Sequence, residues 1–324
     1  MRIDKSMGAL RDSMPWPAIA GPWEHAEDRL ARLDQTLAMS DVRDAWTARA
    51  DVAEAAASAW LDGAAVAIED LVLHDADTAS SLPTPALFKA RSVLLARRTL
   101  DRRVPADVLS VPGILGLHGR RRRQEASLAE QDPGAAERIG TWLRLTGATL
   151  TGDLASLPGL PAAALAFYLW SADPPVRHGG GMLGRLLIPV MLRARGKTRH
   201  HTLAFALGLQ TLWPRPRRGT PPEKGIADIL EAIGNAAMHG LEAHHRLMLA
   251  RTALARPLAG RRSSSRLAAL AALLLRHPVI SAPMAARQLG LSQRGATLLI
   301  DELVRAGCVR ERTGRTRYRA FSLL

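Results

Sequence analysis

The sequence of 324 residues predicts a mainly α-helical protein, and three observations support that fold class. Ala, Leu and Arg dominate a composition that is 47% hydrophobic but only 4% aromatic. Because β-branched and aromatic residues favour strands while Ala, Leu and Arg favour helices, this composition disfavours a sheet-rich fold. Apolar residues also recur at three- and four-residue spacings along much of the chain, as on one face of a helix. The length allows two or three domains with cores of their own.

Charge is distributed unevenly around a formal net charge of +14. Residues 1–90 hold 15 acidic against 8 basic side chains, whereas residues 261–324 hold 12 arginines against 3 acidic side chains. A general enrichment in Arg would explain the total charge, but it would not spare the N-terminal segment. A net of +9 in one small segment is typical of a region that binds a polyanion.

Several classes of protein are disfavoured by what the sequence lacks. Its single cysteine, Cys308, allows neither a disulfide framework nor a cysteine-based metal site. The first residues lack the apolar core of a signal peptide, and the longest apolar runs, 161–170 and 186–192, are too short to cross a bilayer. We therefore expect a cytoplasmic protein of bacterial type that does not associate with membranes.

Stretches rich in proline, glycine or charge divide the chain, and they lie at residues 80–85, 117–124, 131–134, 213–224 and 260–265. We expect 117–124 and 131–134 to be exposed connections and 213–224 to be a loop that cannot be helical. Three domains follow from these breaks: an acidic helical region over 1–125, a helical core over 126–258 and a basic domain over 262–324.

Upstream of these breaks, Leu30, Leu33 and Leu37 lie on one helical face. Residues 226–254 have the apolar spacing of one long helix, or of two helices that meet at Gly240.

That long segment carries a small cluster of histidines. His239, His244 and His245 lie close to Glu242, but none forms an i, i+4 pair with a third ligand nearby. The spacing favours a solvated helix face, so we expect no metal ion there.

The basic segment predicts a helix-turn-helix. Three helices are expected, over residues 267–275, 282–289 and 293 to about 306. Ser281 and Ser292 precede the second and third helices, where a serine side chain caps the free N–H groups of a helix. Gly290 and Leu291 supply the tight turn between these helices, and Gly307 ends the third.

The third of these helices has two different faces. Ala296, Ile300 and Leu303 share one side and are expected to pack inward. The residues at the other side, near the start of the helix, are placed to read base edges in the major groove of double-stranded DNA. These candidate DNA-binding residues are Ser292, Gln293, Arg294, Thr297 and Leu298.

A β-hairpin is expected to follow, with strands over 308–312 and 317–321 and a Thr-Gly-Arg tip. Val309, Tyr318 and Phe321 are candidates for the core. Four arginines line the hairpin, where they suit phosphates or the minor groove: Arg310, Arg312, Arg315 and Arg317. With this hairpin the domain is a winged helix-turn-helix. Such domains also serve as protein-docking modules, although the basic hairpin favours DNA.

A glycine-rich stretch lies in the middle of the chain. One predicted helix stops at Pro174-Pro175 and another begins near Leu183. A glycine loop that leads into a helix presents backbone N–H groups and the positive end of the helix dipole to an anion, although glycines also form ordinary turns. The candidate anion-binding residues, for a nucleotide or a small anion, are Gly179, Gly180, Gly181 and Arg185.

This region resembles the Fic family of nucleotidyl (AMP) transferases. Residues 160–192 read LPAAALAFYLWSADPPVRHGGGMLGRLLIPVML, against the family motif His-Pro-Phe-x-(Asp/Glu)-Gly-Asn-Gly-Arg-x-x-Arg followed by Leu-Leu-Ile-Pro. Residues 58–63 (SAWLDG) are similar to the Ser-x-x-x-Glu-Gly inhibitory motif of that family, with Asp62 in place of Glu. Many Fic proteins also end in a winged helix. The resemblance covers about residues 40–324 and implies a helical Fic-like body.

The chain also resembles a group of rhizobial plasmid-type proteins. In these proteins a domain of unassigned function precedes a helix-turn-helix DNA-binding domain.

The motif positions that carry Fic chemistry are altered. Gly179 and Gly181 are kept, and of the two arginines only the second survives, as Arg185. The other motif positions differ: Pro174 replaces the catalytic His, Val176 the Phe, His178 the acidic metal ligand, Gly180 the Asn and Met182 the first Arg. The resemblance thus implies a catalytically degenerate domain, because the general base, the metal ligand and a phosphate-binding arginine are all missing. His178 directly precedes Gly179, whereas the family histidine lies five residues before that glycine, so His178 does not suit the role of base.

Three functions remain open from the sequence. The favoured one is a DNA-binding transcriptional regulator whose Fic-like body serves in dimerisation or effector sensing. Its partner would be double-stranded DNA, and the protein would form a homodimer. For this function we expect neither a catalytic residue nor a cofactor. The second is a residual nucleotidyl transferase that its winged helix positions. The third is an interaction or antitoxin-like protein, which would need an exposed apolar groove near Trp23, Trp46 or Trp60, where buried tryptophans are expected.

Overall fold

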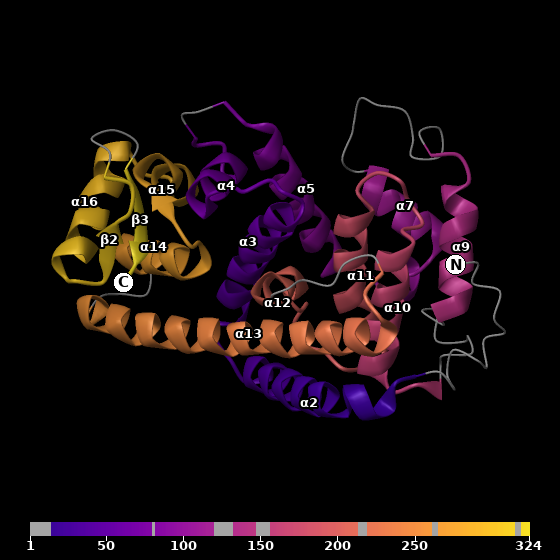
Figure 1. Ribbon diagram of the computed structural model, residues 1–324. Coiled ribbons are helices and arrows are strands. Elements are labelled where there is room, and N and C mark those ends of the chain that lie inside the picture. Colours follow the sequence, from indigo (N-terminus) through magenta and orange to yellow (C-terminus); the bar gives the residue numbers. More distant parts are fainter. Residues whose placement is uncertain are drawn as a thin grey trace. The chain divides into compact units, whose positions relative to one another are not determined.

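The fold is mainly α-helical, as the sequence predicts (Figure 1). The computed structural model describes residues 14–79, 82–119, 132–146, 156–212, 219–260, 265–314 and 319–324. Within this part of the chain, strands occur only in a three-stranded sheet close to the C-terminus. None of the helices in these ranges is long and apolar enough to cross a membrane.

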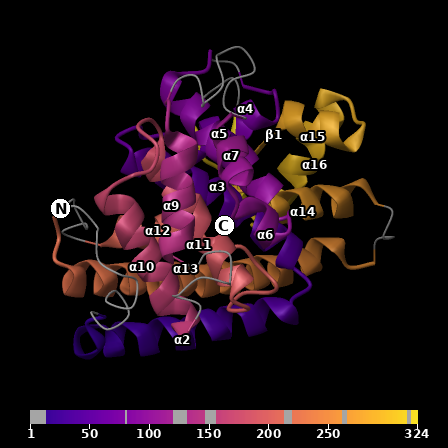
Figure 2. The same ribbon diagram turned by 90° about the vertical axis from the view of Figure 1, so that its right-hand side faces the viewer.

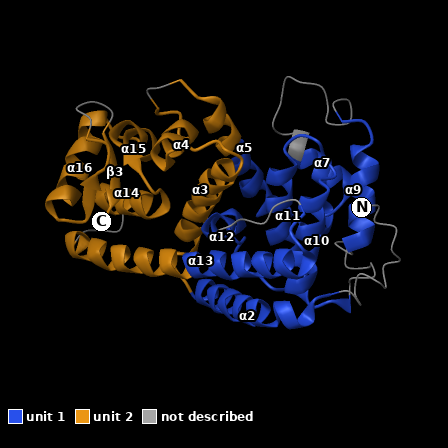
Figure 3. Cartoon of the chain, viewed as in Figure 1, with its two compact units in different colours: residues 1–39, 92–240 blue, residues 40–91, 241–324 orange. Residues whose placement is uncertain are grey.

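The chain folds into two compact units, and each is made of two separate stretches (Figure 3). Unit 1 contains residues 1–39 and 92–240, and unit 2 contains residues 40–91 and 241–324. Two helices contribute residues to both units: α5 (Pro85–Leu100) and α13 (Pro222–Leu258). The sequence predicts instead three domains that are each one continuous segment, and that division stays a prediction.

Unit 1 is built around two neighbouring helices, α10 (Gly159–Ala172) and α11 (Gly180–Ala194), which lie side by side in both ribbon views (Figure 1 and Figure 2). Their close approach depends on Gly184, because a Cβ atom there would lie 2.5 Å from Cδ1 of Trp170. The other helices of the unit are α2 (Trp16–Ala38), α6 (Pro105–Val108), α7 (Val111–Gly119), α9 (Ala135–Thr146) and α12 (Phe205–Thr211).

Unit 2 combines two N-terminal helices with the C-terminal helices and strands. The helices are α3 (Arg43–Leu61), α4 (Ile68–Asp75), α14 (Arg266–Arg276), α15 (Ala282–Leu289) and α16 (Gln293–Arg305). The strands are β1 (Ile280–Ser281), β2 (Val309–Glu311) and β3 (Ala320–Leu323). They pair antiparallel in the order β1-β3-β2, with Phe321 of β3 opposite both Ile280 and Glu311.

Two arginines join the C-terminal elements to the N-terminal helices within unit 2. Arg49 of α3 donates hydrogen bonds of 2.6, 2.7 and 3.0 Å to the carbonyls of Leu275, Leu274 and His277, and so satisfies the free C-terminal carbonyls of α14. Burial lowers the pKa of Arg49 to about 10, which still leaves it charged at neutral pH. Arg287 of α15 donates in the same way to Ala76 and Asp77, at 2.9 and 3.0 Å.

Two of the expected loops prove to be partly helical. Residues 213–224 were expected not to be helical, but α13 begins at Pro222, because a proline in the first turn loses no hydrogen bond. Likewise α7 runs to Gly119, and Leu117 is buried rather than part of an exposed connection. Helix α13 is continuous through Gly240, so the alternative of one long helix is confirmed.

Candidate functional site

Helices α15 and α16 form the helix-turn-helix that the sequence predicts, and their serine caps are in place. The Ser281 hydroxyl accepts a hydrogen bond from the Met284 N–H at 3.3 Å, and the Ser292 hydroxyl accepts one from the Gly295 N–H at 3.0 Å. Gly290, at the end of α15, has φ +61°, a conformation that glycine adopts without strain.

The inward face of α16 is as expected, since Ala296, Ile300 and Leu303 are buried. The opposite face, at the start of the helix, consists of candidate DNA-binding residues: Ser292, Gln293 and Arg294 are exposed, and Leu298 is 60% exposed. Thr297 is half-buried, and its hydroxyl donates to the Gln293 carbonyl at 3.0 Å. The structure thus gathers the five candidates of α16 at one end of one helix.

The hairpin of β2 and β3 follows, and its inner face holds Val309 and Phe321, both buried as expected. The backbone N–H of Arg312 donates to the Ala320 carbonyl at 2.8 Å, which extends the pairing of the strands. Tyr318, Arg315 and Arg317 lie outside the described residues.

The remaining hairpin arginines differ in their surroundings. Arg310 and Arg312 are both exposed, but Nε of Arg312 lies 3.8 Å from a carboxylate oxygen of Glu69 in α4. Arg319, which the sequence did not single out, lies with its guanidinium 5.0 Å from the centre of the Phe321 ring and 3.7 Å from Glu311. Arg319 directly precedes β3, and the alternating pattern Arg-Tyr-Arg could have marked it as an exposed cation.

The glycine-rich loop of unit 1 is shorter than the sequence predicts, because helix α11 begins earlier. Gly179, with φ +73°, is the N-cap of α11, so Gly180 and Gly181 already belong to the helix, which begins three residues before Leu183. A Cβ atom at Gly180 would lie 3.0 Å from Cβ of Pro174. The Trp170 indole N–H also donates to the Gly180 carbonyl at 2.7 Å. The first turn of α11 is therefore packed tightly against its own neighbours.

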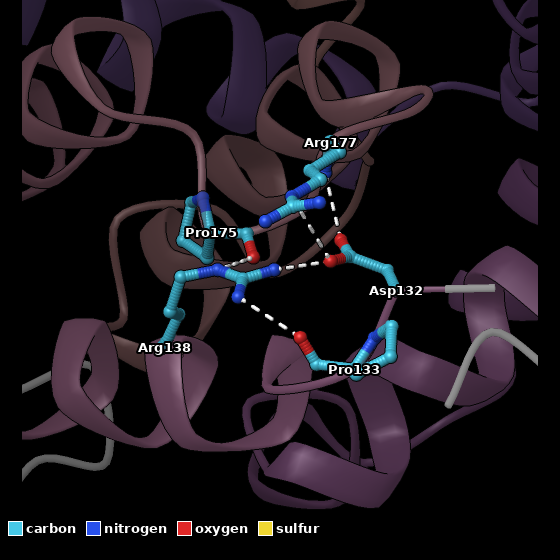
Figure 4. Close-up of polar contacts among 5 residues, drawn as sticks. All are labelled: Asp132, Pro133, Arg138, Pro175 and Arg177. Atoms are coloured by element: carbon cyan, nitrogen blue, oxygen red, sulfur yellow. Dashed lines mark hydrogen bonds and ion pairs between the residues drawn. The ribbon is translucent and has the colours of Figure 1, made fainter. Parts of the chain in front are cut away.

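A buried carboxylate holds the segment that leads into this helix (Figure 4). The Asp132 side chain is fully buried and accepts hydrogen bonds from Arg138 Nη2 at 2.5 Å and from the Arg177 backbone N–H at 2.8 Å. The Arg177 guanidinium lies 3.7 Å from the same carboxylate, and Arg138 Nε donates to the Pro175 carbonyl at 2.8 Å. Burial alone would raise the pKa of Asp132, but these hydrogen bonds and charges outweigh it and lower the pKa.

Sequence reasoning missed Asp132, because residues 131–134 were expected to be an exposed connection. That expectation is wrong for this aspartate, whose partner Arg177 lies 45 positions later in the chain. The one local signal was the sequence Asp-Pro-Gly ahead of a helix, since the Ala135 N–H donates to the Asp132 carbonyl at the start of α9.

The other residues of the glycine-rich region are divided between surface and interior. His178 is exposed, whereas Met182 and Arg185 are only 1% and 6% exposed. The candidate anion-binding residues therefore all lie in the first two turns of α11, but Arg185 is turned into the protein.

The residues that resemble the inhibitory motif lie at the end of α3 in unit 2. Ser58 is buried, and the Asp62 carboxylate lies 3.4 Å from Nζ of Lys89. Of the three tryptophans considered from the sequence, Trp46 is buried, Trp60 is 37% exposed, and the Trp23 indole donates to Glu27 at 3.0 Å.

The histidines of α13 do not form a group with other ligands. His244 Nε2 lies 2.9 Å from the Ser40 hydroxyl, and burial lowers the pKa of this histidine. Within the described ranges, no three His, Cys, Asp or Glu side chains are grouped to hold a metal ion.

Comparisons with known proteins agree with this architecture. Residues 128–259 match the family "Protein of unknown function (DUF1612)", and residues 267–324 match "HTH DNA binding domain". The chain is 30% identical to the "Uncharacterized protein y4cF" of Sinorhizobium fredii, over 95% of this chain and 97% of that protein. This chain belongs to the same family as that protein. The predicted resemblance to rhizobial proteins with an unassigned domain and a helix-turn-helix is confirmed.

Among solved structures, the crystal structure of a Fic family protein from Desulfovibrio desulfuricans G20 is similar. The TM-score is 0.50, and the match covers 95% of this chain and 96% of that one. At 14% sequence identity this likeness shows the fold alone. The Fic-like fold that the sequence predicted is confirmed.

Proposed function

We propose that this protein is a transcriptional regulator that binds double-stranded DNA and whose Fic-like body is catalytically degenerate. The observation that carries the proposal is the exposed start of α16, where Gln293, Arg294 and Leu298 project from a serine-capped helix. In a helix-turn-helix, these are the positions that contact base edges in the major groove. The match to an HTH DNA binding domain over residues 267–324 supports it.

Each candidate on α16 suits a different part of the duplex. The guanidinium of Arg294 can donate two hydrogen bonds to guanine, the Gln293 amide can pair with adenine, and Leu298 can contact the methyl group of thymine. Ser292 and the positive end of the helix dipole suit a phosphate. We assign the β2–β3 hairpin the role of a wing, with Arg310, Arg312, Arg315 and Arg317 as its phosphate or minor-groove contacts.

The catalytic degeneracy is supported by chemistry at the start of α11. Pro174, at the position of the family histidine, has no group that can accept a proton. Met182, at the position of the first arginine, is buried and uncharged, so it cannot bind a phosphate. The Fic-like body would then serve in dimerisation or in effector sensing, with residues 126–258 as its core and 262–324 as the DNA-binding domain.

Selection of random duplex oligonucleotides with the purified full-length protein tests the DNA-binding part. We expect one sequence motif to be enriched, and the Arg294→Ala variant should lose the preference at one base position. The exposed Arg102, which lies in unit 1, supplies a matched control, because Arg102→Ala should select the same motif as the wild type. If the wild-type protein enriches no motif and binds no duplex, the proposal is wrong.

Incubation with radiolabelled ATP and candidate target proteins tests the degenerate part. We expect no labelled product from the wild-type protein. A labelled product that disappears when His178 is replaced by Ala would show that the domain retains nucleotidyl transfer.

A further inference from the structure

Unit 2 contains a cavity of about 330 Å³ between the end of α4 and the start of α5. Its wall has an apolar side, formed by Pro83, Leu87 and Phe88, and a polar side, formed by His74, Asp77 and Arg91. Small-molecule sites have this composition, with apolar and aromatic surface and a few convergent polar groups, and their volumes begin at about 300 Å³.

Arg91 is the residue that indicates the charge of a ligand. Its Nε atom is buried and has no hydrogen-bond partner among the described residues. A buried donor without a partner costs free energy, and a guanidinium binds a carboxylate strongly, through two parallel hydrogen bonds. The exposed ring of Phe88, one helical turn before Arg91, supplies apolar surface for the rest of such a molecule.

The same turn that lines the cavity also contacts the helix-turn-helix. The carbonyls of Ala76 and Asp77 accept the two hydrogen bonds from Arg287 of α15. Asp77 has φ +51°, a left-handed conformation that is uncommon for residues other than glycine, so the backbone of this turn is constrained.

Apolar packing strengthens this connection. Leu73 and Ala79, on either side of the turn, pack in one cluster with Val279 and Ala320, and Ala320 belongs to β3 of the sheet. A change in the turn would therefore reach both α15 and the sheet.

We infer that this cavity binds a small organic carboxylate with an apolar or aromatic body, and that its occupancy changes the affinity of the helix-turn-helix for DNA. The inference rests on the proposed function, because it assigns a regulator to the DNA-binding site. The carboxylate pairs with Arg91 and the apolar body lies against Leu87 and Phe88. By linkage, DNA and the carboxylate change each other's affinity by the same factor.

The first test measures binding without DNA. Phenylacetate and its uncharged isostere phenylacetamide are titrated into the full-length protein, and binding is followed by calorimetry and ligand-observed NMR. Phenylacetate should bind about tenfold more tightly than the amide, because only the carboxylate is itself charged and can accept two parallel hydrogen bonds from the guanidinium. Arg91→Gln should abolish the difference, whereas Arg102→Gln, a control at an exposed arginine, should preserve it. Failure of phenylacetate to bind at millimolar concentrations, or equal binding to wild type and Arg91→Gln, would overturn the site.

The second test measures the affinity for a selected duplex by fluorescence anisotropy, with and without saturating phenylacetate. The affinity should change about fivefold in the wild type and by a smaller factor in Arg287→Gln, which removes the hydrogen bonds to the turn but keeps the apolar contacts and the cavity. A constant affinity in the wild type, despite phenylacetate binding through Arg91, would overturn the coupling. If the protein without phenylacetate binds no duplex while Arg91 still discriminates acid from amide, the site stands and the proposed DNA function fails.

Discussion

The sequence predicts that helices α11 and α16 both begin at residues that contact a negatively charged ligand, an anion at α11 and DNA at α16, yet their surroundings are opposite. At α11, the leading segment is held by Asp132 and Arg138, and Met182 and Arg185 are buried. At α16, Ser292, Gln293 and Arg294 face solvent. The dipole end is common to both helices, so the difference lies in the side chains.

A helix N-terminus suits a polyanion only where the cations near it face outward. Around α11 the Asp132 carboxylate already engages two arginines, and a bound anion would have to compete with a buried negative charge nearby. At the start of α16, Arg294 is exposed, and no ion pair joins it to a carboxylate of the described residues. Substitutions at the two helices should therefore affect different properties: stability at α11 and DNA affinity at α16.

The largest effect on DNA affinity is expected at the hairpin. Replacement of Arg312, Arg315 and Arg317 by Ala should weaken binding to all duplexes and reduce the dependence of log K on log salt by about one unit for each phosphate that the variant no longer neutralises. Within this set, Arg312 should contribute least, because Glu69 lies 3.8 Å from its Nε. Anisotropy titrations at several salt concentrations measure both quantities. An unchanged salt slope would contradict the assignment of the hairpin as a wing.

The next effect is a decrease in stability at α11. Asp132→Ala should lower the free energy of unfolding by about 2–3 kcal/mol, less than for a fully buried ion pair because the freed arginines stay partly in water. Urea denaturation measures it, with Asp70→Ala as control at an exposed aspartate. DNA affinity should stay unchanged. Equal stabilities of the two variants would show that the network around Asp132 contributes nothing.

At α16 the expected effect concerns specificity. Arg294→Ala should cost about 1–3 kcal/mol of binding free energy on the selected site and little on random duplexes, because bidentate hydrogen bonds to guanine distinguish it from the other bases. Its thermal stability should match the wild type, since the side chain is exposed. A uniform decrease in affinity on all sequences would instead show that Arg294 contacts phosphate.

The parts of this molecule that the sequence predicted well are those encoded by neighbouring residues. The caps Ser281 and Ser292 and the turn at Gly290 place α15 and α16 to within a residue, because capping and left-handed turns depend on a few adjacent side chains.

Contacts between distant parts of the chain could not be predicted in this way. Asp132 meets Arg177 across 45 positions, and Arg49 meets Leu274 across 225. Neither partner is marked by local sequence, and a buried aspartate beside Pro-Gly has the same local sequence as one in an exposed turn.

The smallest effect on stability is expected for Asp34 of α2, a second carboxylate of unit 1 that is held by hydrogen bonds within the protein. Burial would raise its pKa, but hydrogen bonds from the His201 ring at 2.9 Å and from the backbone N–H groups of His200 and Arg199 outweigh burial and lower the pKa to about 2. Because the folded pKa is below the usual value of 3.8, the stabilisation is complete above about pH 4 and is lost as the pH falls toward 2.

Asp34→Asn should therefore lower the free energy of unfolding by about 1–2 kcal/mol at pH 7, which is less than the full pKa shift implies because solvent partly screens this carboxylate. The difference from the wild type should become small near pH 2, where about half of the wild-type carboxyl groups are protonated, and should vanish at still lower pH. Urea denaturation across this pH range measures the difference, and Glu24→Gln, at an exposed carboxylate of the same helix, serves as the control. A difference that stays constant from pH 7 to pH 2 would mean that Asp34 stabilises unit 1 by packing rather than by its charge.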